Sequence, residues 1–181
     1  MDFVNGEFVI SEAEVLDILK SALTKLYKND EFLIQNDVHE QTIANRFAMY
    51  LREDLLLAEE NGLRIDVEYN RDGVGRDIKQ NKSQIKIRPD IILHERGSKE
   101  KNYKNDIIYC EIKKDLQSNQ TDIIKIKEQM RQRKYKFGIY IYLIKIDEAQ
   151  FNIYTVRDEE IITRSYKFDH QTRKLEELNN G

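Results

Sequence analysis

Three charged residues lie beside apolar runs in the middle of the chain, where an unpaired charge would be costly. Asp90 follows the only proline of the sequence and precedes an Ile-Ile-Leu run. Glu111 comes 21 residues later, at the end of a second apolar run, and Lys113 follows it at the next position but one. Because side chains alternate between the two faces of a strand, Glu111 and Lys113 are predicted to share one face. A bound cation would compensate the cost of burying the two acids.

The oxygen atoms of this pattern are the ligands that a magnesium ion prefers. Asp90 and Glu111 on adjacent strands would supply carboxylates, and the backbone carbonyl of Ile112 would supply a further oxygen. Lys113 would then lie beside the cation and a water molecule, and both the cation and partial burial would lower its pKa. The simpler alternative is a solvated salt bridge of Glu111 with Lys113 or Lys114 at a strand end, which is what most Glu-x-Lys triplets form.

Cysteine and histidine give no comparable pattern. The single cysteine, Cys110, excludes an internal disulfide, and its apolar neighbours predict a small buried side chain rather than a nucleophile. The histidines His39, His94 and His170 lack the spacing of metal ligands to one another and to Cys110. The sequence therefore favours Mg²⁺ or Mn²⁺ over zinc.

Hydrophobic periodicity predicts the elements that position these residues. Apolar side chains recur at helical spacing over residues 11–28 and 38–60, and Ser11 with Glu14 forms a capping box at the first start. Asp37 is the expected N-cap of the second helix, and Asn61-Gly62 its expected end. The remaining elements are strands at 63–69, 85–93 and 107–112, a helix at 121–133, and strands at 137–146 and 151–156, with residues 161–168 as a candidate for a final edge strand before a polar tail.

This α-α-β-β-β-α-β-β order predicts one α/β domain over residues 1–181, with a mixed central sheet flanked by helices. The segment 107–112 begins as an almost continuous apolar run, so we expect it to be a central, buried strand. The helix at 121–133 would carry the chain from that strand to a parallel neighbour at 137–146. Asp66 and Glu68 would share one face of the first strand, and we expect that face to be exposed rather than to bind a second cation.

Pro89-Asp90 followed by Glu111-x-Lys113 resembles the signature of the PD-(D/E)XK nuclease superfamily. That superfamily includes type II restriction endonucleases, junction resolvases and many repair nucleases. Its restriction-endonuclease-like core has the order α-β-β-β-α-β, and residues 38–146 are predicted to have the same order. The first helix and the last strands would be additions to this core.

The resemblance implies a hydrolase that cuts phosphodiester bonds, with DNA as the expected substrate and RNA as the alternative. In the superfamily the aspartate and glutamate hold Mg²⁺ or Mn²⁺, which here would be Asp90 and Glu111 together with the Ile112 carbonyl. The lysine, here Lys113, assists the attacking water. Many members also carry a glutamate on the helix before the first strand, and Glu40 is well placed for this catalytic and metal-binding role.

The charge distribution limits how a nucleic acid could bind. Charged residues make up 35% of the chain, but they nearly cancel to a formal net charge of −3, which argues against a histone-like binder with a basic field over the whole protein. A local basic face is predicted instead, because helical spacing places Lys127, Arg131 and Lys134 on one side of the 121–133 helix and its end. Such a face would track phosphates, and its simpler alternative is a solvated helix surface.

Two other function classes fit the same sequence. The first is a catalytically silent module of the same fold that binds nucleic acid or a protein partner, and metal-dependent cleavage would separate it from a nuclease. The second is a structural subunit or a homodimer that pairs through an exposed sheet edge, which a mass measurement in solution would reveal. No stretch approaches the roughly 20 apolar residues of a membrane span. The single cysteine and the absence of a signal-peptide pattern favour a cytoplasmic protein.

Overall fold

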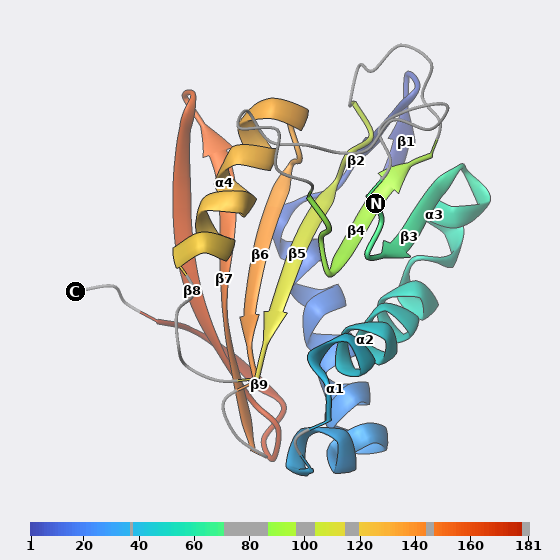
Figure 1. The fold of residues 1–181 in the computed structure, drawn as a ribbon. Helices are drawn as coiled ribbons and strands as arrows, with labels where there is room; N and C mark the ends of the chain where they lie inside the picture. Colours follow the sequence, from blue (N-terminus) through green and yellow to red (C-terminus); the bar gives the residue numbers. More distant parts are fainter. Residues whose placement is uncertain (37, 71–86, 97–103, 115–119, 144–146, 179–181) are drawn as a thin grey trace.

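One mixed sheet of seven strands organises the protein, in the order β3-β4-β5-β6-β7-β8-β9 (Figure 1). The computed structural model describes residues 1–36, 38–70, 87–96, 104–114, 120–143 and 147–178. The strands of this sheet are β3 (Leu63–Val67), β4 (Ile91–Glu95), β5 (Ile108–Lys113), β6 (Phe137–Tyr142), β7 (Glu148–Arg157), β8 (Glu160–Asp169) and β9 (Lys174–Leu178). A separate hairpin pairs β1 (Asp2–Val4) with β2 (Glu7–Val9), and the helices are α1 (Glu12–Gln35), α2 (Glu40–Asp54), α3 (Leu56–Glu60) and α4 (Gln120–Arg133).

The sheet is antiparallel except at its centre, where β5 and β6 run parallel. Parallel neighbours need a crossover connection, and α4 lies between these two strands in the chain. β5 is buried along nearly its whole length, as the apolar run predicted. The predicted class, an α/β fold with a mixed central sheet flanked by helices, is therefore confirmed.

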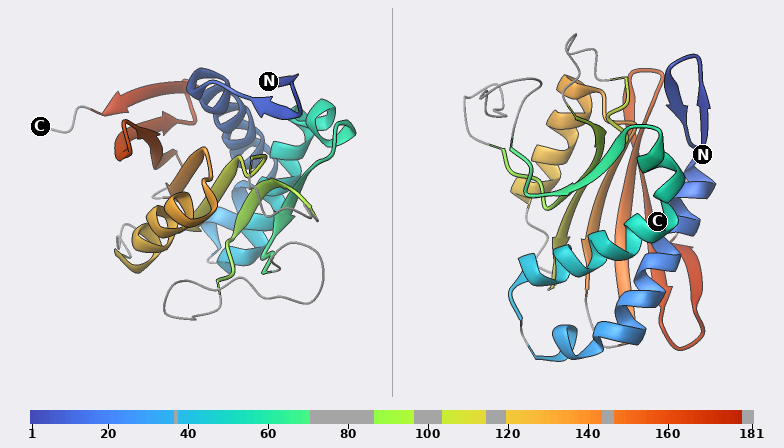
Figure 2. Two further views of the ribbon diagram at one scale, coloured as in Figure 1. Left: turned by 90° about the horizontal axis from the view of Figure 1, so that it is seen from above. Right: turned by 90° about the vertical axis from the view of Figure 1, so that its right-hand side faces the viewer.

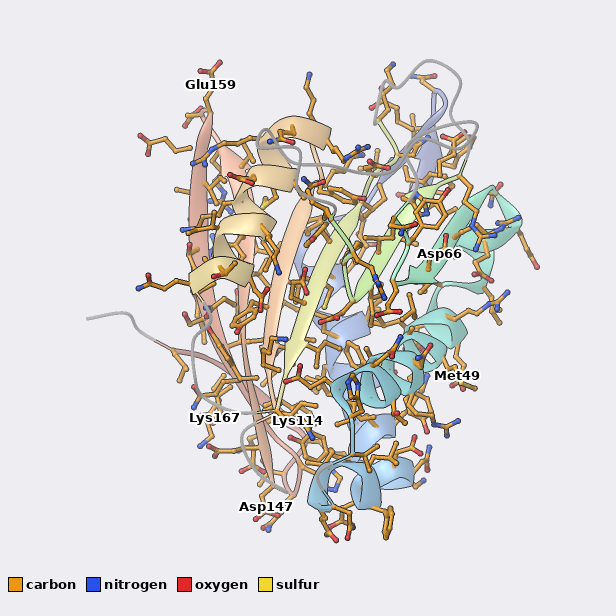
Figure 3. The ribbon with its side chains drawn as sticks, viewed as in Figure 1. Met49, Asp66, Lys114, Asp147, Glu159 and Lys167 are labelled. Carbon is orange, nitrogen blue, oxygen red and sulfur yellow. The ribbon has the colours of Figure 1, made fainter. Side chains whose placement is uncertain are left out.

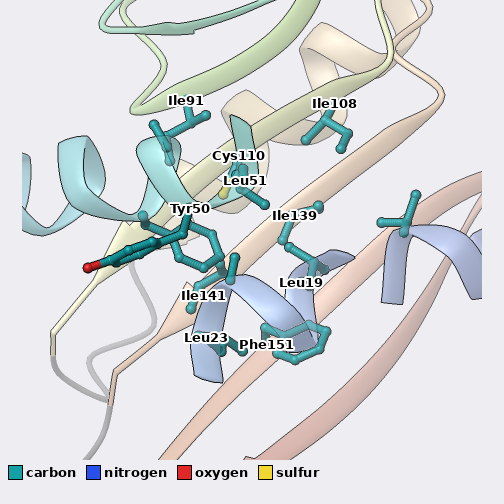
Figure 4. Close-up of a cluster of buried hydrophobic side chains, with 14 of the residues drawn as sticks. Leu19, Leu23, Tyr50, Leu51, Ile91, Ile108, Cys110, Ile139, Ile141 and Phe151 are labelled. Carbon is teal, nitrogen blue, oxygen red and sulfur yellow. The ribbon is translucent and has the colours of Figure 1, made fainter. Parts of the chain in front are cut away.

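Helices cover the two faces of the sheet unequally (Figure 2). One face packs on α1 and α2 in a large apolar core that includes Leu19, Leu51 and Phe151 (Figure 4). The other face packs on α4, in a smaller cluster rich in tyrosine. Cys110 lies in the larger core and Tyr109 in the smaller one, because alternate residues of β5 face opposite sides.

Local signals explain where the helices begin and end. The amide of Glu14 donates to the Ser11 hydroxyl oxygen at 3.2 Å, and the Ser11 amide donates to a Glu14 carboxylate oxygen at 2.8 Å, so the predicted capping box forms. The predicted helix at 38–60 is divided at Leu55 into α2 and α3, and it ends before Gly62, which has a φ of +105°. Asp37 lies outside the described residues, and His39 caps α2.

Several predicted boundaries were wrong. Of the strand predicted at 85–93, residues 85 and 86 lie outside the described part, and β4 starts only at Ile91. The strand predicted at 137–146 ends at Tyr142, with 144–146 outside the described residues. The hairpin of β1 with β2 was missed, and so was β9, whose polar sequence was assigned to a tail. Within the described residues, no helix combines the length and apolarity needed to cross a bilayer.

The packing of α4 against β6 makes a first prediction. A Cβ atom added at Gly138 would lie 2.3 Å from Ile126 Cγ2 and 2.7 Å from Met130 Sδ, which is too close for either contact. We expect Gly138→Ala to lower the free energy of unfolding by roughly 1–3 kcal/mol through overpacking. Chemical denaturation checks this, with Ile126→Ala as the partner change that removes the nearer methyl. The double variant should lose less free energy of unfolding than the two single variants lose together. Simple additivity of the two losses would contradict the proposed clash.

Candidate active site

The abrupt start of β4 exposes the edge of β5 to Asp90. The pairing of β4 with β5 begins at Ile91 opposite Cys110, so the residues of β5 beyond Cys110 have no β4 neighbour. Asp90 takes that place, and its Oδ2 accepts a hydrogen bond from the Ile112 amide at 2.8 Å. Pro89 directly before it has no amide hydrogen to add to a ladder, which fits a residue that stands just outside a strand.

Glu111 lies next to Asp90 and is the more deeply buried of the two acids. Its side chain is on the α4 face of β5, the residue is only 4% exposed, and its Oε1 accepts a hydrogen bond from the Tyr109 hydroxyl at 2.9 Å. Burial first, and then the nearby charges of Asp90 and Asp122, raise the pKa of Glu111 well above its ordinary value. Glu111 is also hydrogen-bonded to Asp90.

Burial also raises the pKa of Asp90, although the hydrogen bonds from the Ile112 amide and from Glu111 oppose the rise. A buried carboxyl group and a partly buried one that lie side by side cannot both ionise cheaply. The pair therefore favours either a shared proton or a bound cation. This is the electrostatic condition that the sequence predicted for these two residues.

The Ile112 carbonyl faces the same edge as Asp90. In an extended strand the amide and carbonyl of one residue leave the backbone toward the same neighbour, and the next residue points the other way. The Ile112 amide bonds to Asp90, whereas the Lys113 carbonyl accepts from the Leu143 amide on the β6 side at 2.8 Å. The two carboxyl groups and this carbonyl form an all-oxygen donor set, which suits Mg²⁺ or Mn²⁺.

Lys113 is held by acids on two helices. Its Nζ donates to Glu40 Oε2 at 2.9 Å and lies 3.7 Å from Asp122 Oδ2. The second Glu40 oxygen accepts from the Lys114 amide at 3.3 Å, so Glu40 at the start of α2 clamps the end of β5. Glu40 is thus brought to the site as the resemblance implied, but its described partners are the two lysines.

In the absence of a cation, the pKa of Lys113 is raised, and the lowering expected beside a bound cation stays a prediction. Burial alone would lower it, but the hydrogen bond and charge of Glu40, followed by the charges of Asp122 and Asp90, outweigh burial and raise the pKa above its ordinary value. Lys113 is therefore a fixed positive charge in this arrangement. A lysine in that state orients or neutralises an anion, and it is a poor proton acceptor.

Asp122 belongs to the site although the sequence analysis did not select it. It is 3% exposed in the first turn of α4, and its Oδ1 accepts from Lys125 Nζ at 2.6 Å. Its Oδ2 is buried and forms no hydrogen bond with the described residues, and Lys113 Nζ lies 3.7 Å from it. A signal was available, since Asp122 lies four residues before the buried Ile126 and therefore on the same helix face.

The remaining predicted residues lie away from this centre. Among the residues that the structure describes, no three His, Cys, Asp or Glu side chains gather closely enough to hold a metal ion on their own. Lys127, Arg131 and Lys134 run along α4 and its end, toward the opposite end of the sheet from Lys113. The first of them places its ammonium group 5.4 Å from the centre of the Tyr154 ring.

The prediction of an exposed acidic face on β3 is also wrong. Asp66 is buried and accepts hydrogen bonds from His94 Nε2 at 2.9 Å and from Arg96 Nε at 2.6 Å. Burial opposes its ionisation, but these two partners outweigh burial and lower the pKa of Asp66. β3 ends at Val67, so Glu68 lies beyond the strand, where it pairs with Arg88 at 3.3 Å. Figure 3 shows Asp66 well away from Lys114, which marks the end of β5.

Comparison of the chain with protein-family models, with curated proteins and with solved structures found no match. The likeness to the nuclease superfamily consequently rests on the motif residues and on the order of the elements around them.

The raised pKa of Glu111 predicts how stability depends on pH. A carboxyl group whose pKa is higher in the folded state stabilises the protein below its unfolded pKa of about 4.3, and that contribution is lost as pH rises through the folded pKa. In EDTA at pH 7, Glu111→Gln should therefore be more stable than wild type by on the order of 1–2 kcal/mol, or roughly 2–8 °C in Tm. The advantage should shrink as the pH approaches 4.5.

Thermal melts of both proteins across this pH range check the prediction. Glu160→Gln is the matched control, because Glu160 is exposed and its variant should follow wild type at every pH. A Glu111→Gln protein that is less stable than wild type at pH 7 would show that the acid pair is not under electrostatic stress.

Proposed function

We propose that this protein is a Mg²⁺- or Mn²⁺-dependent nuclease that hydrolyses phosphodiester bonds, with DNA as the substrate, on a restriction-endonuclease-like core. The observation that carries the proposal is the pair of a buried Glu111 and a partly buried Asp90 beside a charged Lys113. The order α2-α3-β3-β4-β5-α4-β6 around these residues supports it, because apart from the short α3 it is the α-β-β-β-α-β order of the superfamily. The motif alone would be weak evidence in so charged a chain.

The acid pair gives the site a reason to bind a divalent cation. Asp90 and Glu111 would hold it together with the Ile112 carbonyl, and Tyr109 orients Glu111 through its hydroxyl group. When bound, such a cation polarises a phosphate oxygen and makes a water molecule more acidic. It would also let both carboxyl groups ionise, which the metal-free pair resists.

Lys113 contributes charge rather than base chemistry. Its ammonium group is kept protonated by Glu40 and Asp122, so its role is to orient the attacking water or to offset negative charge that builds up on the phosphorus centre. Glu40 is a positioning residue in this scheme. It holds Lys113 through one oxygen and the backbone of Lys114 through the other.

Cleavage assays test the function directly. The purified protein would be incubated with plasmid, linear, single-stranded and branched DNA and with RNA, each in Mg²⁺, in Mn²⁺ and in EDTA. Cutting of at least one DNA substrate that stops in EDTA is the expected result. Binding to nucleic acid without cutting under any of these conditions would instead favour the catalytically silent module.

Removing the lysine gives the sharpest variant. We expect Lys113→Ala to lower the cleavage rate by a factor on the order of 10²–10³, because it deletes a charge that acts on the transition state. Lys167→Ala is the control. Lys167 on β8 forms an ion pair with Glu148 on β7, so this variant should cleave DNA at the wild-type rate. Undiminished cutting by a folded Lys113→Ala protein would remove Lys113 from the mechanism.

Substitutions of Glu40 and of Glu111 should impair cleavage in different ways. Glu111→Gln removes a proposed metal ligand, so it should raise the Mn²⁺ concentration needed for half-maximal cleavage. Glu40→Gln loosens the clamp on Lys113, so it should lower the maximal rate with a smaller change in that concentration. Titration of cleavage with Mn²⁺ for each variant measures both quantities. If Glu40→Gln shifts the midpoint as far as Glu111→Gln, then Glu40 is itself a ligand.

A further inference from the structure

A cavity of about 600 Å³ lies at the end of α4 that is farther from Lys113. It lies between the last turns of α4, the segment that follows them and the turn between β7 and β8. Met130 and Tyr135 form a buried apolar floor, and Val156 and Ile161 continue the apolar wall toward solvent. Figure 3 shows the two ends of the sheet, with Glu159 at the cavity end and Lys114 at the candidate active site.

Positive charge gathers at the mouth of this cavity. Arg131, Lys134 and Lys136 line it against a single carboxylate, Glu159, in a chain whose net charge is −3. Lys136 donates to the Phe8 carbonyl. Arg131 and Lys134 are exposed, and neither forms an ion pair with another residue that the structure describes. The mouth therefore offers two cations to an anion that reaches it from solvent.

A basic and aromatic strip leads from the cavity along α4. Lys127 precedes Arg131 by one helical turn, and its ammonium group lies over the Tyr154 ring. Tyr154 and Val156 alternate to the same face of β7, so the floor of the strip is continuous with the cavity wall. The span from Lys127 to Lys134 is about 10 Å, measured at the rise of a helix.

We propose that this cavity binds one nucleotide of a single nucleic-acid strand, with the base against the apolar wall and the flanking phosphates on Arg131 and Lys134. A nucleotide joins a flat π surface to an anion, which is the combination that the wall and the mouth present. The volume lies within the usual range of roughly 300–1,000 Å³ for ligand cavities. A base stacked inside a duplex cannot place its flat face against this wall, so the strand must be unpaired at this position.

This proposal depends on the proposed nuclease function in one respect, which is that the bound strand is the substrate to be cut. Binding at the cavity requires neither a metal ion nor cleavage, so it can be measured in EDTA. The distance from the acid pair places this nucleotide away from the scissile phosphate. The cavity would therefore hold the substrate strand beyond the point at which it is cut.

The test uses fluorescence anisotropy with a short labelled oligothymidylate and with an abasic strand of the same length, across a range of salt concentrations. Wild type should bind the base-bearing strand on the order of tenfold more tightly than the abasic strand. Val156→Glu places a carboxylate at the mouth, on a side chain that is 49% exposed and can change without disturbing the fold. It should abolish that preference.

Arg131→Ala and Lys134→Ala should each reduce the salt slope of binding by about 0.7, as expected for one lost phosphate contact on a single strand. Lys167→Ala is the control for a general loss of charge. Thermal melts establish that every variant is folded.

Three results would overturn the assignment. They are equal binding of the base-bearing and abasic strands by wild type, unchanged binding by Val156→Glu, and thymidine monophosphate binding as tightly as the oligonucleotide. The last would identify a site for free nucleotides instead of a strand. If the protein binds the strand through the cavity but cuts nothing, only the nuclease proposal is contradicted. If it cuts nucleic acid without binding through the cavity, only the cavity proposal is contradicted.

Discussion

The contact between the partly buried Asp90 and the buried Glu111 is the constraint around which the rest of the site is built. It exists because β4 begins one residue after Asp90 while β5 continues past Cys110, which leaves the Ile112 amide free to bind Asp90. Two acids held this way need a proton or a cation. Glu40 and Asp122 add two further carboxyl groups, and they form ion pairs with the ammonium groups of Lys113 and Lys125. Among the described residues, carboxyl groups therefore outnumber ammonium groups at this centre.

That imbalance bears on how a nucleic acid would approach. A phosphate is not attracted to a centre rich in carboxyl groups unless positive charge is added there first. In the proposed function the divalent cation is thus a condition for binding at the centre as well as for chemistry. Lys113 does not supply this charge alone, because Glu40 already occupies its ammonium group. Substrate affinity must then come from elsewhere on the surface, and the exposed Arg131 and Lys134 at the end of α4 have no ion-pair partner among the described residues.

The sequence allowed the acid pair to be predicted better than its surroundings. Alternation on β5 placed Glu111 and Lys113 on one face, and the isolated proline marked Asp90, because both rules depend only on local backbone geometry. The state of Lys113 without a cation was not predicted, since its pKa is then set by Glu40, 73 residues away in the sequence. The start of β4 was misplaced because an alternating Ile pattern continues upstream of Pro89 without pairing in the described residues. β1, β2 and β9 were missed, as short or polar edge strands carry little apolar periodicity.

The charges on α4 have a simpler explanation that must be weighed against a binding role. A helix dipole favours acids near the N-terminus and bases near the C-terminus, and Asp122 and Arg131 follow this rule. The dipole accounts for the sign of these charges, but it acts only within the first and last turns. The helix dipole does not explain why an apolar cavity lies beside Arg131 and Lys134. It also does not explain why Val156, on β7, is half-exposed at the mouth of that cavity. Apolar surface left open beside unpaired cations raises the free energy of the isolated protein, and a ligand that is both flat and anionic removes both costs at once.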